Sequence, residues 1–262
     1  MASERRAVQL GRLVGASGLT IGDEQGYVAF STRELGLTEK IARLASLAGQ
    51  WTKDPIRNKG DKPFLRNLLN GQDLLDIPEF MDVATHPVFY GAVTKYLGQA
   101  PWLVSMNLWL TPPNQTAVRS QLYHYDHKDT RQAKIFINLN DVTPDCGPLH
   151  FLPATESIKV EKAAGYSQGR YTDEEVYGAV AKSEVVATVG NTGNGFIVDT
   201  ARCLHYGSRG NVKERLMLMV NFARVNCVDR GSGCEVLDQV RDQLIRQRYS
   251  MDPARAFTIG SH

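Results

Sequence analysis

Between residues 103 and 223 the chain is divided into short apolar runs by glycine, proline and other turn residues. The run at residues 134–139 alternates strictly, as a β-strand with one buried face does. One face carries Ile135, Ile137 and Leu139, and the other carries Lys134, Phe136 and Asn138. Further strands are expected at residues 26–30, 103–111, 149–152, 185–189, 195–199 and 216–223. Short strands separated by such turns predict an all-β sandwich or barrel.

The first 100 residues have a helical pattern instead. Residues 37–50 carry apolar side chains at helical spacing behind Thr38, a candidate N-cap. Residues 77–97 are also predicted to be helical, with a break at Pro87 and a C-terminal stop at Gly98.

Three segments stand apart from this pattern. Residues 52–63 form a basic, polar loop, which either meets an acidic substrate or is an ordinary solvated loop. Residues 154–183 interrupt the strands, and Thr172 with Glu175 has the spacing of a helix-capping box. Such a long connection is either a lid over a ligand or surface decoration, and we expect the lid. Residues 236–248 have helical spacing and are expected to pack on the barrel rather than bind a partner.

We therefore expect one domain over residues 1–262, mainly β with flanking helices. In this division residues 1–100 are an N-terminal helical support and residues 101–225 are a jelly-roll core. The core contains the insertion at residues 154–183, and residues 226–262 form a C-terminal helix.

Two histidines and an aspartate are the candidate metal ligands. His124 and Asp126 form an H-x-D pair, and residues i and i+2 of an extended chain point the same way. His205 lies 79 residues after Asp126 and can face the pair from an opposing strand. Two histidines and one carboxylate suit non-haem Fe(II) and leave coordination positions open. An H-x-D pair alone is weak evidence, because it occurs by chance in many chains.

Arg215 makes the set more specific, because it opens the run at residues 216–222 (LMLMVNF). A 2-oxo acid can chelate iron through its keto oxygen and C1 carboxylate. The far carboxylate of 2-oxoglutarate then needs a partner deep in the barrel. Arginine suits that task because its guanidinium stays charged and binds carboxylates in a two-pronged way.

These segments resemble the phytanoyl-CoA dioxygenase family of Fe(II)/2-oxoglutarate oxygenases. The resemblance is carried by His124-Tyr125-Asp126, by residues 134–143 (KIFINLNDVT) and 146–153 (CGPLHFLP), and later by residues 195–199 (GFIVD), His205 and Arg215. Residues 23–28 and 86–98 also resemble the N-terminal part of the family. The resemblance implies a double-stranded β-helix of the cupin-like kind. It also implies Fe(II), 2-oxoglutarate and O2, with hydroxylation as the usual outcome.

Carried over by position, His124, Asp126 and His205 resemble the catalytic metal ligands, and Arg215 resembles the 2-oxoglutarate anchor. Four further residues are candidates for lining the cosubstrate pocket. Gln121 and Phe136 match such positions, whereas Trp109 and Asn107 on the preceding strand are either pocket residues or ordinary structural ones.

The chain departs from the family at two positions. Glu156 stands where a histidine is usual, and Gly207 replaces a small hydroxyl residue that often helps to bind 2-oxoglutarate. Two other histidines are not expected to be ligands. His127 is out of phase with the H-x-D pair and is a candidate substrate contact, while His150 is expected to be an ordinary strand residue.

Composition excludes several classes of partner. The net charge of +2 and the absence of long basic runs argue against nucleic acid, and no run is long and apolar enough for a membrane span. No C-x-x-C pair occurs, so free thiols are expected at Cys146, Cys203, Cys227 and Cys234. We expect a cytoplasmic monomer or homodimer with a small-molecule substrate.

The function expected from the sequence is an Fe(II)/2-oxoglutarate-dependent dioxygenase. It would oxidise a C–H bond of a small metabolite, such as an amino acid or a secondary-metabolite intermediate, and release succinate and CO2. In halogenating relatives the carboxylate ligand is replaced by a small residue, so Asp126 favours hydroxylation or a related oxidation. The alternatives are a cupin-like metal-binding or sensing module, which gives no reason for Arg215, and a degenerate structural barrel.

Overall fold

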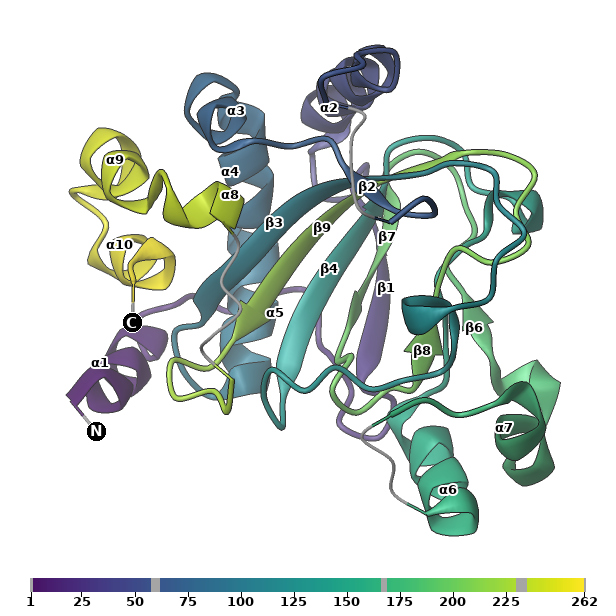
Figure 1. Cartoon of the computed structure of the whole chain (residues 1–262). Coiled ribbons are helices and arrows are strands. Elements are labelled where there is room, and N and C mark those ends of the chain that lie inside the picture. Colours follow the sequence, from purple (N-terminus) through teal and green to yellow (C-terminus); the bar gives the residue numbers. More distant parts are fainter. Residues whose placement is uncertain (1, 58–61, 166–168, 230–234, 262) are drawn as a thin grey trace.

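Two antiparallel sheets form the centre of the molecule in the computed structural model, which describes residues 2–57, 62–165, 169–229 and 235–261 (Figure 1). The larger sheet has the order β1 (Tyr27–Ser31), β7 (Asn194–Val198), β4 (Gln132–Asn138), β9 (Arg215–Ala223), β3 (Trp102–Thr111) and β2 (Arg66–Asn67). The smaller sheet has the order β6 (Val186–Ala187), β5 (His150–Phe151) and β8 (His205–Tyr206). This architecture confirms the prediction of a mainly β jelly roll with flanking helices.

The alternation in β4 decides what each face of the larger sheet meets. Ile135 and Ile137 are fully buried in the main hydrophobic core. Phe136 lies on the other face, in a cluster with Phe151 of the smaller sheet. The smaller sheet therefore covers the face of β4 that also carries Lys134.

Helices cover the outer face of the larger sheet (Figure 1). They are α2 (Thr38–Trp51), α3 (Gly71–Asp76), α4 (Pro78–Ala84) and α5 (Pro87–Leu97), and they share the main core with β3, β4 and β9. The predicted break at Pro87 and stop at Gly98 are confirmed, and Gly98 adopts the left-handed conformation with φ 72°. The predicted N-cap is wrong: α2 begins at Thr38 itself, and Leu37 precedes it without a side-chain cap.

The tail is more broken than the single helix expected from its periodicity. It contains α8 (Glu235–Asp238), α9 (Arg241–Leu244), a π-helical turn (Ile245–Tyr249) and α10 (Pro253–Ile259), and α10 contacts α1 (Ala2–Gly11). Arg241 is only 2% exposed. Its guanidinium donates to the carbonyl oxygens of Leu103, Val104 and Ile259. A register shift between Leu103 and Ser105 disturbs the β3–β9 ladder there, so Arg241 satisfies carbonyls at an interrupted pairing.

The insertion at residues 154–183 forms α6 (Ala154–Ala164) and α7 (Asp173–Ala179), which lie beyond the smaller sheet (Figure 1). The predicted capping box of Thr172 and Glu175 is present at the start of α7. Val160 and Val176 join a second core with Tyr123, Leu152 and Tyr206. The insertion is thus a packed layer, and its role as a lid stays a prediction.

Short 3₁₀ turns occur at Arg119–Gln121, Pro144–Cys146 and Lys182–Glu184. Within the described ranges no helix is both long and apolar enough to cross a membrane. Cys146 and Cys203 are buried free thiols, as expected, and Cys227 is also buried, while Cys234 and part of the basic loop at residues 52–63 lie outside the described residues.

Candidate metal centre and anion-binding cavity

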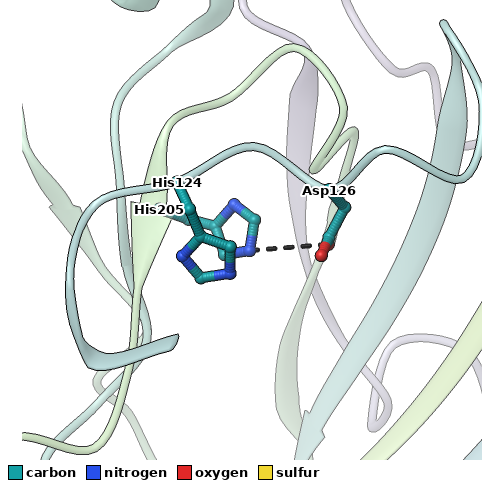
Figure 2. A group of neighbouring side chains, drawn as sticks. All are labelled: His124, Asp126 and His205. Atoms are coloured by element: carbon teal, nitrogen blue, oxygen red, sulfur yellow. Dashed lines mark ion pairs between the residues drawn. The ribbon is translucent and has the colours of Figure 1, made fainter. Parts of the chain in front are cut away.

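His124, Asp126 and His205 come together beside the smaller sheet (Figure 2). The backbones of His124 and His205 exchange two hydrogen bonds, with N–O distances of 3.0 and 3.1 Å. The N–H of Asp126 donates to the carbonyl of Thr200 at 2.9 Å. One ligand atom from each of the three side chains lies within 4.8 Å of the others. The predicted triad therefore has the spacing of a single-ion site.

Each histidine ring is oriented by a carbonyl two residues earlier. Nδ1 of His124 lies 2.8 Å from the oxygen of Leu122, and Nδ1 of His205 lies 3.0 Å from the oxygen of Cys203. A carbonyl only accepts hydrogen bonds, so each Nδ1 carries the proton and donates it. The Nε2 lone pair of each ring is thereby left free for a metal.

Burial and electrostatics keep the three groups in the forms that bind metal. Burial, with the neighbouring His205 ring, lowers the pKa of His124 to about 3, and burial also lowers the pKa of His205. Burial alone would raise the pKa of Asp126, but Lys134 and the two histidines outweigh it and lower that pKa below its ordinary value. At neutral pH the site holds two neutral imidazoles and one carboxylate.

The turn beneath Asp126 is held by a buried carboxyl group. Asp199 is fully buried, accepts a hydrogen bond from the Tyr96 hydroxyl at 2.6 Å and accepts further bonds from the N–H groups of Gln132 and Ala201. Burial raises the pKa of Asp199 to about 6. Thr200, whose carbonyl accepts from Asp126, is the next residue along this turn.

A cavity of about 200 Å³ runs from the triad between the two sheets. Its lining consists of Lys62, Leu65, Trp109, Ser120, His124, Asp126, Lys134, Phe136, Leu149, His205, Gly207, Ser208, Arg215, Met217 and Met219. A larger cavity of about 720 Å³ shares Asp126 with it and is lined partly by Ile158 and Glu161 of α6. The insertion thus reaches a space next to the metal ligands.

Arg215 is a buried cation without a carboxylate partner among the described residues. The side chain is 2% exposed, and its one hydrogen bond within the described part of the chain runs from Nη2 to the Thr111 hydroxyl at 3.4 Å. Nε and Nη1 are buried and have no hydrogen-bond partner within the same described ranges. Burial lowers the pKa of Arg215 to about 10, so the guanidinium is still charged at neutral pH. A buried unpaired charge is costly, and this one is suited to an anion that enters the cavity.

The structure places Trp109 and Phe136 in this lining, together with the triad and Arg215. Asn107 lies on the same face of β3 as Trp109 but does not line the cavity. Gln121 is fully buried outside it: Nε2 donates to Asn114 and to the carbonyl of Ser208, and Oε1 accepts from Thr116 and Val118. Gln121 therefore supports the loop after β8 instead of facing a cosubstrate directly.

The two departures from the family pattern have simple structural settings. Glu156 lies in the first turn of α6 and pairs with Lys159. A Cβ added to Gly207 would lie 3.8 Å from Nη2 of Arg215, so this position borders the Arg215 guanidinium and has room for a side chain.

The histidines outside the triad also have clear settings. His150 stacks on Tyr206 at 4.7 Å, away from the metal ligands, as expected for a strand residue. His127 lines the larger cavity and is not part of the triad.

Lys134 is the functional candidate that the sequence reasoning missed. Its Nζ lies 2.6 Å from Oδ2 of Asp126, and the lysine side chain is 15% exposed. The signal was present in the alternation of residues 134–139, which placed Lys134 on the same face as Phe136. A lysine on the inward face of a core strand is unusual, because lysine is almost never buried without a partner.

No family model and no curated protein matches this chain. Solved structures with similar folds do exist. EctD from S. alaskensis in its apoform has a TM-score of 0.58 at 16% identity, over 85% of this chain and 91% of that one. The non-heme alpha-ketoglutarate-dependent carbocyclase SnoK from nogalamycin biosynthesis has a TM-score of 0.53 at 17% identity, over 85% of each chain.

HygX from Streptomyces hygroscopicus, crystallised with nickel and 2-oxoglutarate, has a TM-score of 0.51 at 11% identity, over 78% of this chain and 84% of that one. At such low identities the similarity concerns the fold, and it confirms the predicted double-stranded β-helix. Membership of the phytanoyl-CoA dioxygenase family stays a prediction.

Proposed function

We propose that this protein is a non-haem Fe(II)/2-oxoglutarate-dependent dioxygenase that oxidises a C–H bond of a small metabolite. The observation that carries the proposal is the presence of a metal-ligand triad and an unpaired, buried Arg215 in one cavity. A metal-binding module without oxidase chemistry would need the triad but would gain nothing from Arg215. The charge of Arg215 costs stability unless an anion binds there.

The side chains present fit this metal. His124 and His205 would bind through Nε2 and Asp126 through a carboxylate oxygen, which leaves open positions as in the facial triads of non-haem iron oxygenases. Bound Fe(II) would supply the redox chemistry that couples decarboxylation of 2-oxoglutarate by O2 to substrate oxidation, with release of succinate and CO2.

The protein's own contribution is orientation and exclusion of water. The carbonyls of Leu122 and Cys203 hold the two imidazole rings with Nε2 directed into the site. Arg215 would pair with the distal carboxylate of 2-oxoglutarate, and the apolar side chains of Phe136, Leu149 and Met217 would flank the rest of that molecule.

The structural neighbours support the class of substrate. EctD has been crystallised with 2-oxoglutarate and 5-hydroxyectoine, and the epimerase SnoN with Fe3+, alpha ketoglutarate and nogalamycin RO. These are small metabolites, which agrees with the modest cavity found here. The retained carboxylate of Asp126 favours hydroxylation or a related oxidation over halogenation.

An anaerobic titration of the metal-free protein with Fe(II) and then 2-oxoglutarate tests the proposal. A weak visible absorption band from the metal–oxo acid chelate is expected only after both have been added, and it should be absent in His205→Ala. Metal binding without that band would instead support a binding or sensing module. Lack of metal binding by the wild-type protein would point to a structural barrel.

A further inference from the structure

Lys134 and Asp126 form an ion pair inside the cavity, at 2.6 Å from Nζ to Oδ2. The same oxygen, Oδ2, lies 3.5 Å from Nε2 of His205. The ammonium group of Lys134 therefore contacts the Asp126 oxygen that faces the metal site. A divalent metal on the triad would compete with Lys134 for this carboxylate and repel the ammonium at short range.

The charges that line the cavity do not balance once the proposed metal and cosubstrate are present. Asp126 and 2-oxoglutarate would bring three negative charges, whereas a divalent metal, Arg215 and Lys134 would bring four positive charges. Lys62 adds a further positive charge at a partly exposed position. Arg215 would be neutralised by the distal carboxylate of the cosubstrate, so the unmatched charge falls on Lys134.

From this ion pair and the unmatched positive charge we propose that Lys134 recognises a carboxylate group on the substrate that is to be oxidised. The inference rests on the proposed function and names the substrate class. In the metal-free protein Lys134 is held by Asp126. Metal binding at Asp126 frees the ammonium for the carboxylate of the substrate. The substrate site would then form only after the metal has bound.

The experiment uses Co(II) in place of iron, because high-spin Co(II) gives a visible spectrum and broadens the NMR signals of nearby ligands. The protein is loaded anaerobically with Co(II) and 2-oxoglutarate and then titrated with acetate, the smallest carboxylate probe. Acetamide serves as the neutral probe of nearly the same shape. The variants are Lys134→Met, Lys134→Arg and Lys95→Met, the last removing an equal charge at an exposed position on α5.

Broadening of the acetate methyl signal is expected for the wild type, for Lys95→Met and, in part, for Lys134→Arg. In Lys134→Met the acetate concentration that gives the same broadening should be higher by about 10-fold or more, because a desolvated charge partner has been lost. Acetamide should broaden much less than acetate. The Co(II) spectrum should respond to 2-oxoglutarate equally in all variants, and Lys134→Gln replaces Lys134→Met if the latter does not fold.

Equal acetate broadening in the wild type and Lys134→Met would overturn the proposal, as would equal broadening by acetamide. If Lys134→Met weakens the spectral response to 2-oxoglutarate instead, Lys134 holds the cosubstrate, and the substrate assignment is wrong. Failure of the wild-type Co(II) spectrum to respond to 2-oxoglutarate would refute the proposed function itself, and this is seen before acetate is added.

Discussion

Arg215→Met should stabilise the metal-free protein while it weakens the response to 2-oxoglutarate. The methionine keeps an unbranched apolar chain but removes the charge whose Nε and Nη1 have no partner. The lowering of the Arg215 pKa from 12.5 to about 10 corresponds to about 3 kcal/mol spent on burying the charge. Since some packing is also lost, we expect the free energy of unfolding to rise by about 1–3 kcal/mol.

The opposite effect is expected once the ligand is present. A bound ligand at about 100 times its Kd stabilises the folded state by about 2.7 kcal/mol. Loss of a buried charge partner should raise the 2-oxoglutarate Kd by about 30-fold or more. At the same ligand concentration the stabilisation of Arg215→Met should then fall below about 1 kcal/mol.

Urea unfolding of the metal-free protein, and of the Ni(II)-loaded protein with and without 2-oxoglutarate, measures both effects. Arg209→Met is the matched control, because Arg209 pairs with Asp173 at 2.9 Å and lies 3.5 Å above the Tyr206 ring. That control should lose stability and keep its 2-oxoglutarate response. A marked loss of stability in metal-free Arg215→Met, or an unchanged response to 2-oxoglutarate, would show that Arg215 is structural and would remove the main support for the cosubstrate.

Three further outcomes are expected. His124→Ala or His205→Ala should abolish turnover and weaken Fe(II) binding, and wild-type metal affinity in either variant, measured by titration, would exclude the triad. Asp199→Asn should gain stability relative to the wild type by up to about 3 kcal/mol as the pH rises from about 4 to about 8. The reason is that the pKa of Asp199, raised to about 6, makes the wild-type carboxyl group stabilising only while it is protonated. Urea unfolding of both proteins across this pH range measures the difference, and a constant difference would contradict the prediction. Residues 154–183 should be cut by protease more slowly when metal, 2-oxoglutarate and substrate are bound, and equal cutting rates would count against a lid.

The sequence predicted those parts of the fold and site that depend on local periodicity. Strict alternation at residues 134–139 placed Phe136 and Ile135 on opposite faces of the strand, as the structure has them. The i, i+2 spacing of His124 and Asp126 likewise predicted that both could face one ion. These inferences need only the geometry of an extended strand, which does not depend on distant residues.

The features that escaped prediction depend on contacts between distant segments. Gln121 can be buried because Asn114 and Ser208 accept hydrogen bonds from its Nε2, and Thr116 and Val118 donate hydrogen bonds to its Oε1. Arg241 is buried because β3 offers free carbonyls, and no helical periodicity in the tail could show this. The pairing of Lys134 with Asp126 was accessible in principle, because a lysine on an inward face must find a partner.

The backbone bridge between His124 and His205 joins residues that are 81 positions apart in the sequence. Closing so long a loop costs chain entropy before any contact is gained, and chains rich in such contacts fold slowly. We therefore expect that the three ligands do not form a local nucleus for folding, because they come from segments that are far apart in the sequence. Refolding rates should then be insensitive to metal, and ions should exchange at a barrel that is already folded.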